Sequence, residues 1–252
     1  MNRLARLGLI AKGIVYLALG AMAFMAAFEW GGQNEENASR TGVFQWLKES
    51  GGSWLLLVVA AGLVCYCIWR FAEAFTSNGG GKKTAKRLRY FLSGLAYTSV
   101  AFTAGQLALQ SGKSDSGSHW TTDLMSRPGG QIFAIVAALV LAGIGVYQLH
   151  YSLSGKYKKH VQGLGLGDQK SALLLRSGKI GYLARGVVWL ILAYLLGRAA
   201  LQQDSSGTGD TSKAFQFLEQ GWTFGSYLLG AVGLGVIAYG IFSFVRARYE
   251  RF

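Results

Sequence analysis

The sequence predicts an all-α integral membrane protein whose six transmembrane helices form three tandem two-helix repeats. Two observations carry this prediction. Six apolar stretches are each long enough to cross a bilayer, and the same residue types recur along the chain at offsets of +81 and then +92. A sequence that repeats at fixed offsets indicates a structure built from one recurring unit, so we expect three equivalent helical hairpins.

The predicted spans follow from the length of the apolar runs. About 20 residues in a helix that rises ~1.5 Å per residue cover the ~30 Å hydrocarbon layer. Unbroken runs such as Leu55 to Gly62 exclude alternating strands, and within lipid a helix satisfies its own backbone hydrogen bonds. We predict spans at 9–28, 53–72, 90–109, 131–150, 181–200 and 226–245, in repeats 1–80, 81–160 and 161–252 of a single membrane domain.

The charges predict the orientation of the chain. The net charge is +13, and hydrophobic residues make up 51% of the sequence against 15% charged residues. Of the 25 Lys and Arg residues, 19 lie at the termini, in the second and fourth connections or at the span ends that adjoin them, whereas nine of the 12 acidic residues lie in the other three connections. The positive-inside rule therefore predicts that both termini face the cytoplasm. Because no other targeting signal appears, we expect a bacterial inner membrane as the location. The basic face should attract anionic lipid headgroups, and this distribution disfavours a nucleic-acid role.

Small residues mark the expected helix contacts. Each repeat carries a glycine at an equivalent position in both of its helices, within a stripe at three-then-four spacing. Small side chains let lipid-embedded helices approach closely, so these glycines are predicted packing positions. Because every repeat contains two crossings, the three can be related by a pseudo-threefold axis along the membrane normal. The glycines are Gly13, Gly94 and Gly186 in the first helices, and Gly62, Gly143 and Gly235 in the second.

Six aromatic residues recur at one predicted depth in the same stripes. They can line a ligand pocket on the pseudo-axis, or they can belong to an interfacial aromatic belt or bond to neighbouring backbone, and we favour the structural interpretation. They are Tyr16, Tyr66, Tyr97, Tyr147, Trp189 and Tyr239.

Basic residues recur at the predicted cytoplasmic ends of the helices. They can bind lipid phosphate or another anion, although snorkelling that anchors the topology is the simpler interpretation. They are Arg6, Lys12, Arg87, Lys179 and Arg185.

A weaker polar cluster is conceivable at the inner ends of the second and fourth spans. Arg70 and Glu73 have the spacing of a helix-surface ion pair, and Gln148 and His150 end the fourth span. The four residues can meet only if these two spans converge.

The three histidines share no ligand spacing and the two cysteines point to different sides of one helix, so we predict neither a metal site nor a cofactor.

The repeat unit resembles the bacterial membrane family catalogued as domain of unknown function 1206. The resemblance rests on the segments Arg6 to Tyr16, Gly62 to Arg70, Lys179 to Trp189 and Gly235 to Phe242. The middle repeat departs from the pattern, with Arg89 and Ser93 at positions that hold glycine and a basic residue in the other repeats. The resemblance implies six helices and a membrane location, and no activity.

Absences in the sequence limit the function. The middle of each predicted span has no Asp, Glu, Lys, Arg or His, and no span contains a proline. Ion-coupled carriers usually place such ionisable residues near mid-membrane and use broken helices. We therefore expect a non-enzymatic binding or scaffold protein for lipid, a hydrophobic small molecule or a membrane complex. A pore for a neutral or hydrophobic solute along the pseudo-axis is the alternative, and a membrane enzyme is the third possibility.

Overall fold

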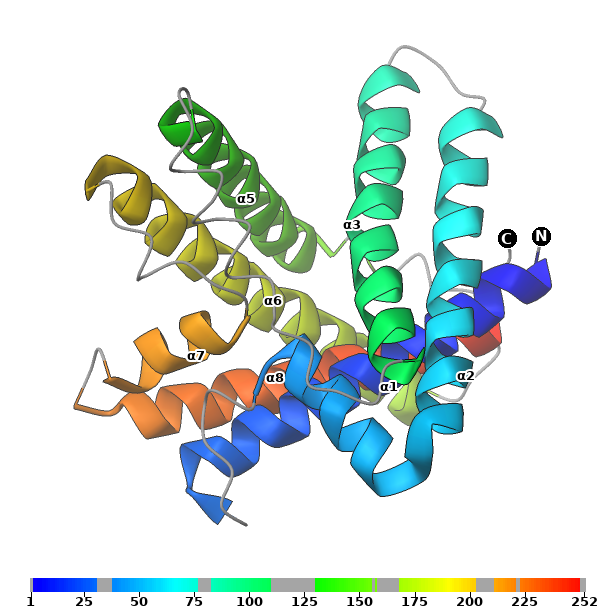
Figure 1. Cartoon of the computed structure of the whole chain (residues 1–252), viewed down its shortest axis with the longest axis horizontal. Helices are drawn as coiled ribbons and strands as arrows, with labels where there is room; N and C mark the ends of the chain where they lie inside the picture. Colours follow the sequence, from blue (N-terminus) through cyan, green and yellow to red (C-terminus); the bar gives the residue numbers. More distant parts are fainter. Residues whose placement is uncertain are drawn as a thin grey trace. The chain divides into compact units, whose positions relative to one another are not determined.

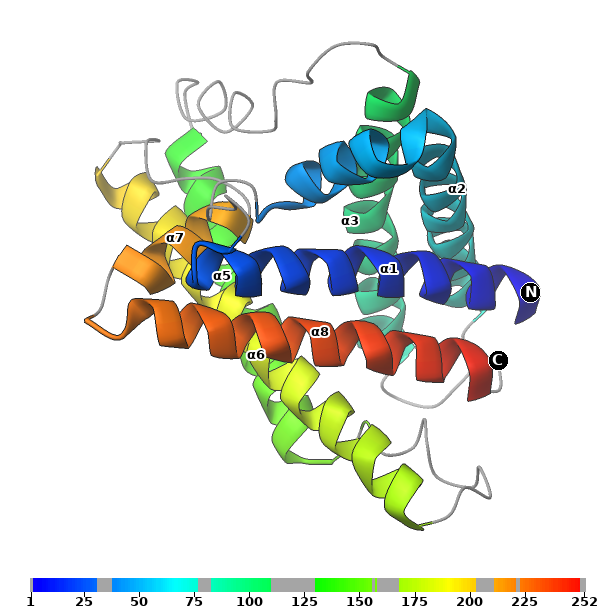
Figure 2. The same cartoon turned by 90° about the horizontal axis from the view of Figure 1, so that it is seen from below.

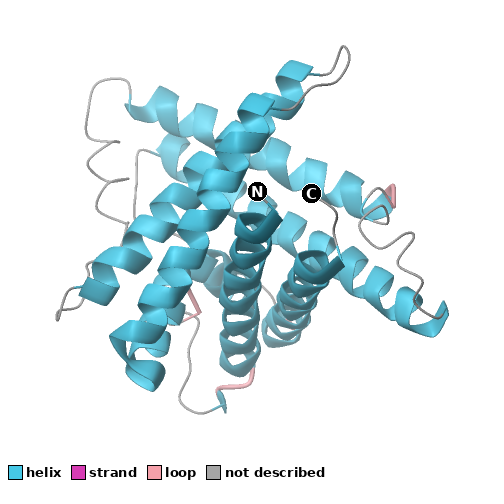
Figure 3. Ribbon diagram, turned by 90° about the vertical axis from the view of Figure 1, so that its right-hand side faces the viewer, coloured by secondary structure: helices cyan, strands magenta, loops and turns pink. Residues whose placement is uncertain are grey.

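The computed structural model describes residues 2–30, 38–76, 83–109, 130–155, 157, 168–202, 211–220 and 223–249, and this part of the chain contains helices and no strand (Figure 3). The helices are α1 (Asn2–Ala27), α2 (Arg40–Thr76), α3 (Lys83–Leu109), α5 (Gly130–Leu153), α6 (Asp168–Gln202), α7 (Thr211–Gln220) and α8 (Gly225–Tyr249) (Figure 1).

Within the part of the chain that the structure describes, five helices are long and apolar enough to cross a membrane, namely α1, α2, α5, α6 and α8. The prediction is thus confirmed that the chain contains several helices long and apolar enough to span a membrane. The remaining predicted span, 90–109, lies in α3, which is helical but not in this set, because it also carries hydroxyl residues and a glutamine. The hydroxyls of Thr98 and Thr103 donate to carbonyls one turn earlier in α3, at 2.9 and 3.0 Å. Such bonds let a hydroxyl-bearing helix satisfy its side chains internally.

Helix α2 bends sharply near its middle. Gly52 has φ 76° and ψ 169°, a left-handed backbone conformation that suits glycine. The bend separates an amphipathic segment that begins at Arg40 from the long apolar helix that follows (Figure 1). Phe44 in this segment and Phe215 in α7 are 1% and 0% exposed. Phe44 lies in the first and Phe215 in the fifth of the connections between the predicted spans, and both side chains are buried within the protein.

The chain divides into two compact units. Unit 1 comprises residues 1–15, 44–114 and 243–252, and unit 2 comprises residues 16–43 and 115–242. Helices α1 and α8 contribute to both units and run side by side in opposite directions (Figure 2).

In unit 1, glycines bring α1 and α2 into close contact. A Cβ atom added to Gly8 would lie 2.6 Å from the Cα atom of Tyr66, and one added to Gly62 would lie 2.5 Å from the Cβ atom of Ala11. A backbone atom cannot move aside as a side chain can, so position 8 requires glycine. In the same unit, the ring of Phe71 in α2 lies 3.0 Å from a Cβ atom built on Gly94 of α3.

In unit 2, α6 and α8 pack in the same way. A Cβ atom added to Gly181 would lie 2.6 Å from the Cα atom of Tyr239, and one added to Gly235 would collide with Ala184. Helix α6 also packs along α5, where a Cβ atom on Gly186 would lie 2.7 Å from the side chain of Leu149.

The two hairpins α1–α2 and α6–α8 therefore share their contacts position by position. Gly8 and Gly181 are separated by the same 173 residues as Tyr66 and Tyr239, and as Ala11 and Ala184. Gly143 of the middle repeat differs, because a Cβ atom built there meets nothing within 4 Å. At the positions of Ala11 and Gly8 the middle repeat carries the larger residues Leu92 and Arg89, which rule out an equally close approach.

Candidate functional site

Lys12 of α1 lies between two tyrosine rings in unit 1. Its Nζ atom is 4.9 Å from the ring centroids of both Tyr66 and Tyr97, and it donates a hydrogen bond of 3.2 Å to the Tyr66 hydroxyl. Lys12 is 4% exposed and Tyr66 is fully buried. A charge on a membrane-spanning helix is costly unless it is solvated internally, and two ring faces with a hydroxyl do so here. We call Lys12, Tyr66 and Tyr97 the Lys12 cluster.

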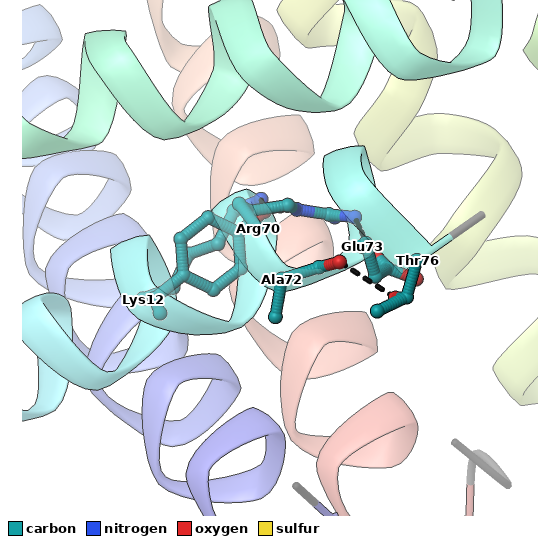
Figure 4. Close-up of polar contacts among 6 residues, drawn as sticks. Lys12, Arg70, Ala72, Glu73 and Thr76 are labelled. Carbon is teal, nitrogen blue, oxygen red and sulfur yellow. Dashed lines mark hydrogen bonds and ion pairs between the residues drawn. The ribbon is translucent and has the colours of Figure 1, made fainter.

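An ion pair borders the Lys12 cluster. The Nε atom of Arg70 donates to the Tyr66 hydroxyl at 2.9 Å. The Nη1 atom of Arg70 pairs with Glu73 Oε2 at 2.6 Å, and the two side chains lie side by side in Figure 4. The Arg70 guanidinium carbon also lies 4.2 Å from the ring centroid of Trp69. The side chains of Arg70 and Glu73 are only 11% and 27% exposed, so this pair belongs to the interior of unit 1 more than to its surface.

Arg185 of α6 occupies the corresponding place in unit 2. Its guanidinium carbon lies 4.2 Å from the ring centroid of Tyr239 and 4.7 Å from that of Tyr16. The two rings themselves meet edge to face, with centroids 4.9 Å apart. Both tyrosines are buried, at 2% and 5% exposure. We call these three residues the Arg185 cluster.

The two clusters use equivalent positions of the repeat. Lys12 and Arg185 are 173 residues apart, as are Tyr66 and Tyr239. In each cluster the cation and one tyrosine come from the same repeat, whereas the second ring comes from the first helix of another repeat. The middle repeat has Ser93 at the position of the cation and forms no such cluster around it.

The remaining members of the predicted aromatic set lie in unit 2. Tyr147 of α5 is 42% exposed and stacks on Tyr151 with a centroid distance of 5.8 Å. Trp189 of α6 is half-buried and lines a small cavity together with Arg185. The six residues thus occur in different surroundings: four lie in the cation clusters and two do not.

Three of the predicted basic residues are exposed, in contrast to Lys12. They are Arg6, Arg87 and Lys179. Arg87 donates a hydrogen bond of 3.5 Å to the carbonyl of Phe75, near the end of α2. The carbonyl of Lys179 accepts a hydrogen bond of 2.7 Å from the Ser152 hydroxyl, which joins α6 to α5.

The four residues of the predicted polar cluster fall into both units. Arg70 and Glu73 belong to unit 1, while Gln148 and His150 belong to unit 2. Gln148 is 7% exposed and its Oε1 atom has no hydrogen-bond partner among the described residues, whereas His150 is exposed. Over the described ranges, no three His, Cys, Asp or Glu side chains lie close enough to hold a metal ion.

An apolar groove runs between α5 and α6 in unit 2, where the two helices lie side by side (Figure 1). Its volume is about 360 Å³, within the range of small-molecule sites. The Tyr194 hydroxyl is the one polar side-chain group in its lining. The groove is lined by Ile135, Ala138, Leu139, Ala142, Leu190, Ala193, Tyr194, Gly197 and Leu201.

Comparison with known proteins assigns the chain to a family. The family described as Domain of Unknown Function (DUF1206) matches three tandem segments, residues 7–77, 88–155 and 180–250. The chain belongs to this family. The DUF1206 chain is also 26% identical over 258 residues to an uncharacterized protein of Bacillus subtilis (strain 168), YxxB, with 99% of this chain and 91% of the relative covered. No solved structure matches it.

Family membership confirms the three predicted repeats. Each matched segment of the DUF1206 chain covers most or all of two long helices, and the third segment also contains the short helix α7. Sequence reasoning placed Lys12 and Arg185 at the ends of helices and did not foresee that tyrosines would surround them. One signal was available: each cation lies four residues before the recurring aromatic position of its own helix, at Tyr16 and Trp189. Arg40 was missed as a lining residue of the small cavity beside Arg185, because it lies in a connection between predicted spans, where no lining role was expected.

Proposed function

We propose that this DUF1206 chain is a non-enzymatic bacterial inner-membrane protein that binds a lipid acyl chain in the groove between α5 and α6. The groove carries the proposal, since it combines sufficient volume with an almost wholly hydrocarbon lining. In a membrane, the molecules that surround such a groove are lipids, whose acyl chains are flexible and thin. A helix about 10 Å across is too broad for a cavity of this volume.

The shape of the groove supports this occupant. Its lining combines small residues on both helices, Ala138 and Ala142 on α5 and Ala193 and Gly197 on α6, with larger aliphatic side chains such as Leu139 and Leu190. An acyl chain buried there gains dispersion contacts with every wall, without a polar group that needs a partner.

The proposal includes the finer architecture. It has six transmembrane helices, with α3 as the sixth, both termini in the cytoplasm, and three repeats related by a pseudo-threefold axis along the membrane normal. The repeated glycine contacts of α1–α2 and α6–α8 support the symmetry. The concentration of Lys and Arg in the even-numbered connections supports the orientation and an attraction for anionic headgroups.

The experiment uses a phospholipid with a photoactivatable group on its acyl chain, incorporated with the full-length protein into vesicles. After illumination, peptides are mapped by mass spectrometry. We expect labelling at groove residues of α5 and α6, and loss of most of it in Ala142→Phe, whose ring fills the groove. Ala231→Phe is the matched control, because Ala231 is exposed on α8 and does not line the groove.

Equal labelling of Ala142→Phe and wild type would contradict acyl-chain binding in the groove. A flux assay on the same vesicles tests the alternative function. Passage of a neutral solute that depends on the protein would favour a pore and overturn the binding proposal.

A further inference from the structure

The groove between α5 and α6 lies in one half of this helix pair, and its place there indicates which lipids supply the acyl chain. This inference rests on the proposed function, since it concerns the chain that the groove binds. The α5 part of the lining runs from Ile135 to Ala142, and the α6 part runs from Leu190 to Leu201. Both parts are remote from Leu153 and Asp168, the two residues that the α5–α6 connection joins.

Close contacts fill the other half of the pair. A Cβ atom added to Gly145 would lie 3.1 Å from the carbonyl oxygen of Gly186, and one added to Gly186 would lie 3.2 Å from that of Gly145. Nearer the connection, the Ser152 hydroxyl donates a 2.7 Å hydrogen bond to the carbonyl of Lys179. The two backbones meet in this half, so a hydrocarbon chain does not fit between them.

The groove begins where these close contacts end. Leu190 is the first lining residue of α6, and a Cβ atom on Gly145 would lie 2.8 Å from its side chain. Further along, a Cβ atom on Gly197 would lie 3.7 Å from the Cβ atom of Ala138, an ordinary van der Waals distance. The lining continues to Leu201, one residue before the end of α6. The groove therefore extends from the tight contact to the helix end.

The length of the groove matches one leaflet of a bilayer. Leu190 and Leu201 are 11 residues apart, so the lining extends over ~16 Å along α6. The hydrocarbon layer is ~30 Å thick, and each leaflet contributes half of it. An acyl chain of one leaflet thus fits along the groove, with its ester end near Leu201 and its methyl end near Leu190.

The charges beyond the two ends of the pair assign the leaflet. Residues 154–167, between α5 and α6, contain three lysines and no acidic residue, whereas residues 203–210, which follow α6, contain two aspartates and no basic residue. The positive-inside rule then predicts that the groove lies in the outer half of the membrane. We propose that the groove binds an acyl chain of an outer-leaflet phospholipid, from the leaflet remote from the α5–α6 connection.

The test uses the full-length protein with a specific protease site inserted after Gly163, reconstituted into sealed vesicles. A phosphatidylcholine with a photoactivatable group near the end of its acyl chain is exchanged into the exposed layer of the vesicles alone. After illumination, the protease cuts only the molecules whose α5–α6 connection faces outward. Cut and uncut chains therefore report on opposite leaflets, and mass spectrometry measures the label in their groove peptides.

We expect labelling in the uncut chains, whose groove lies in the loaded layer, and a fall to the level of Ala142→Phe in the cut chains. Stronger labelling of the cut chains, or equal labelling of both, would overturn the leaflet assignment and leave acyl-chain binding in place. Lipid loaded into both layers is the control for the insertion, because inserted and unmodified chains should then label equally. If groove peptides of the unmodified chain stay unlabelled in that control, the proposed function and this inference both fail.

Discussion

The Lys12 cluster and the Arg185 cluster place a cation between two tyrosine rings at equivalent positions of two repeats, yet the cations differ. Lys12 carries a compact ammonium that is almost fully buried and bonds to the Tyr66 hydroxyl. Arg185 carries a planar guanidinium that is half-buried, stacks on its two rings and also borders a cavity. The same repeat position thus holds a cation against two rings in both units, and in unit 2 this cation also borders a small cavity.

The glycine contacts should show the largest effect. Gly8→Ala and Gly181→Ala each place a methyl group against the backbone of a tyrosine, so each should lower the free energy of unfolding by about 3 kcal/mol. Thermal unfolding of the purified variants measures this loss. Gly105→Ala is the control, because a Cβ atom there meets nothing within 4 Å. If Gly8→Ala is as stable as Gly105→Ala, the close α1–α2 contact is absent from the protein.

Removal of the cations should distinguish the two clusters. Lys12→Ala should cost about 2 kcal/mol and Arg185→Ala about 1 kcal/mol, since the attraction between a cation and aromatic rings is stronger where water is excluded. Chemical denaturation of both variants gives the comparison. Equal and negligible costs would mean that the rings do not stabilise either cation.

The Tyr66 hydroxyl should matter more than an exposed one. It accepts from Lys12 and from Arg70, so Tyr66→Phe removes one partner from each buried cation and should cost about 1–2 kcal/mol. Tyr227→Phe is the control, because Tyr227 is 70% exposed. Similar unfolding midpoints for the two variants would argue against this hydrogen-bond network.

The Arg70–Glu73 pair should give the smallest change. Both side chains are partly exposed, and i,i+3 ion pairs of this kind add little to the free energy of unfolding. Glu73→Gln should therefore lower it by about 0.5 kcal/mol. The same unfolding measurement applies, with Glu49→Gln as an exposed control on α2. If Glu73→Gln lowers the free energy of unfolding as much as Lys12→Ala does, the negative charge of Glu73 is essential for balancing the positive charge of the Lys12 cluster.

The fold was predictable to the extent that it depends on the length of the apolar runs and on the internal repeat. Runs of 20 apolar residues determine helices in lipid, and all six predicted spans lie in helices, apart from Phe28, which directly follows the end of α1. The middle repeat was less predictable. The hydroxyl residues of α3 lower its hydropathy, and among the described residues five rather than six helices meet the length and hydropathy expected of a span.

The candidate site was predictable in its residue types and not in its contacts. The recurrence of tyrosines and basic residues was visible, but recurrence does not say which ring from another repeat will lie over which cation. The approach of Tyr97 to Lys12, and of Tyr16 to Arg185, depends on packing between repeats. The place of Arg40 in the lining of a cavity of unit 2 likewise depends on packing that recurrence does not reveal.

A pair of double-mutant cycles tests the central claim most directly. One cycle combines Lys12→Ala with Tyr97→Leu, and the other combines Arg185→Ala with Tyr16→Leu. If the two clusters are equivalent, both cycles should give a coupling free energy of about 1 kcal/mol, because each pair interacts across a repeat boundary. Additive effects in both cycles would contradict the claim that a cation and an aromatic ring from another repeat hold the repeats together.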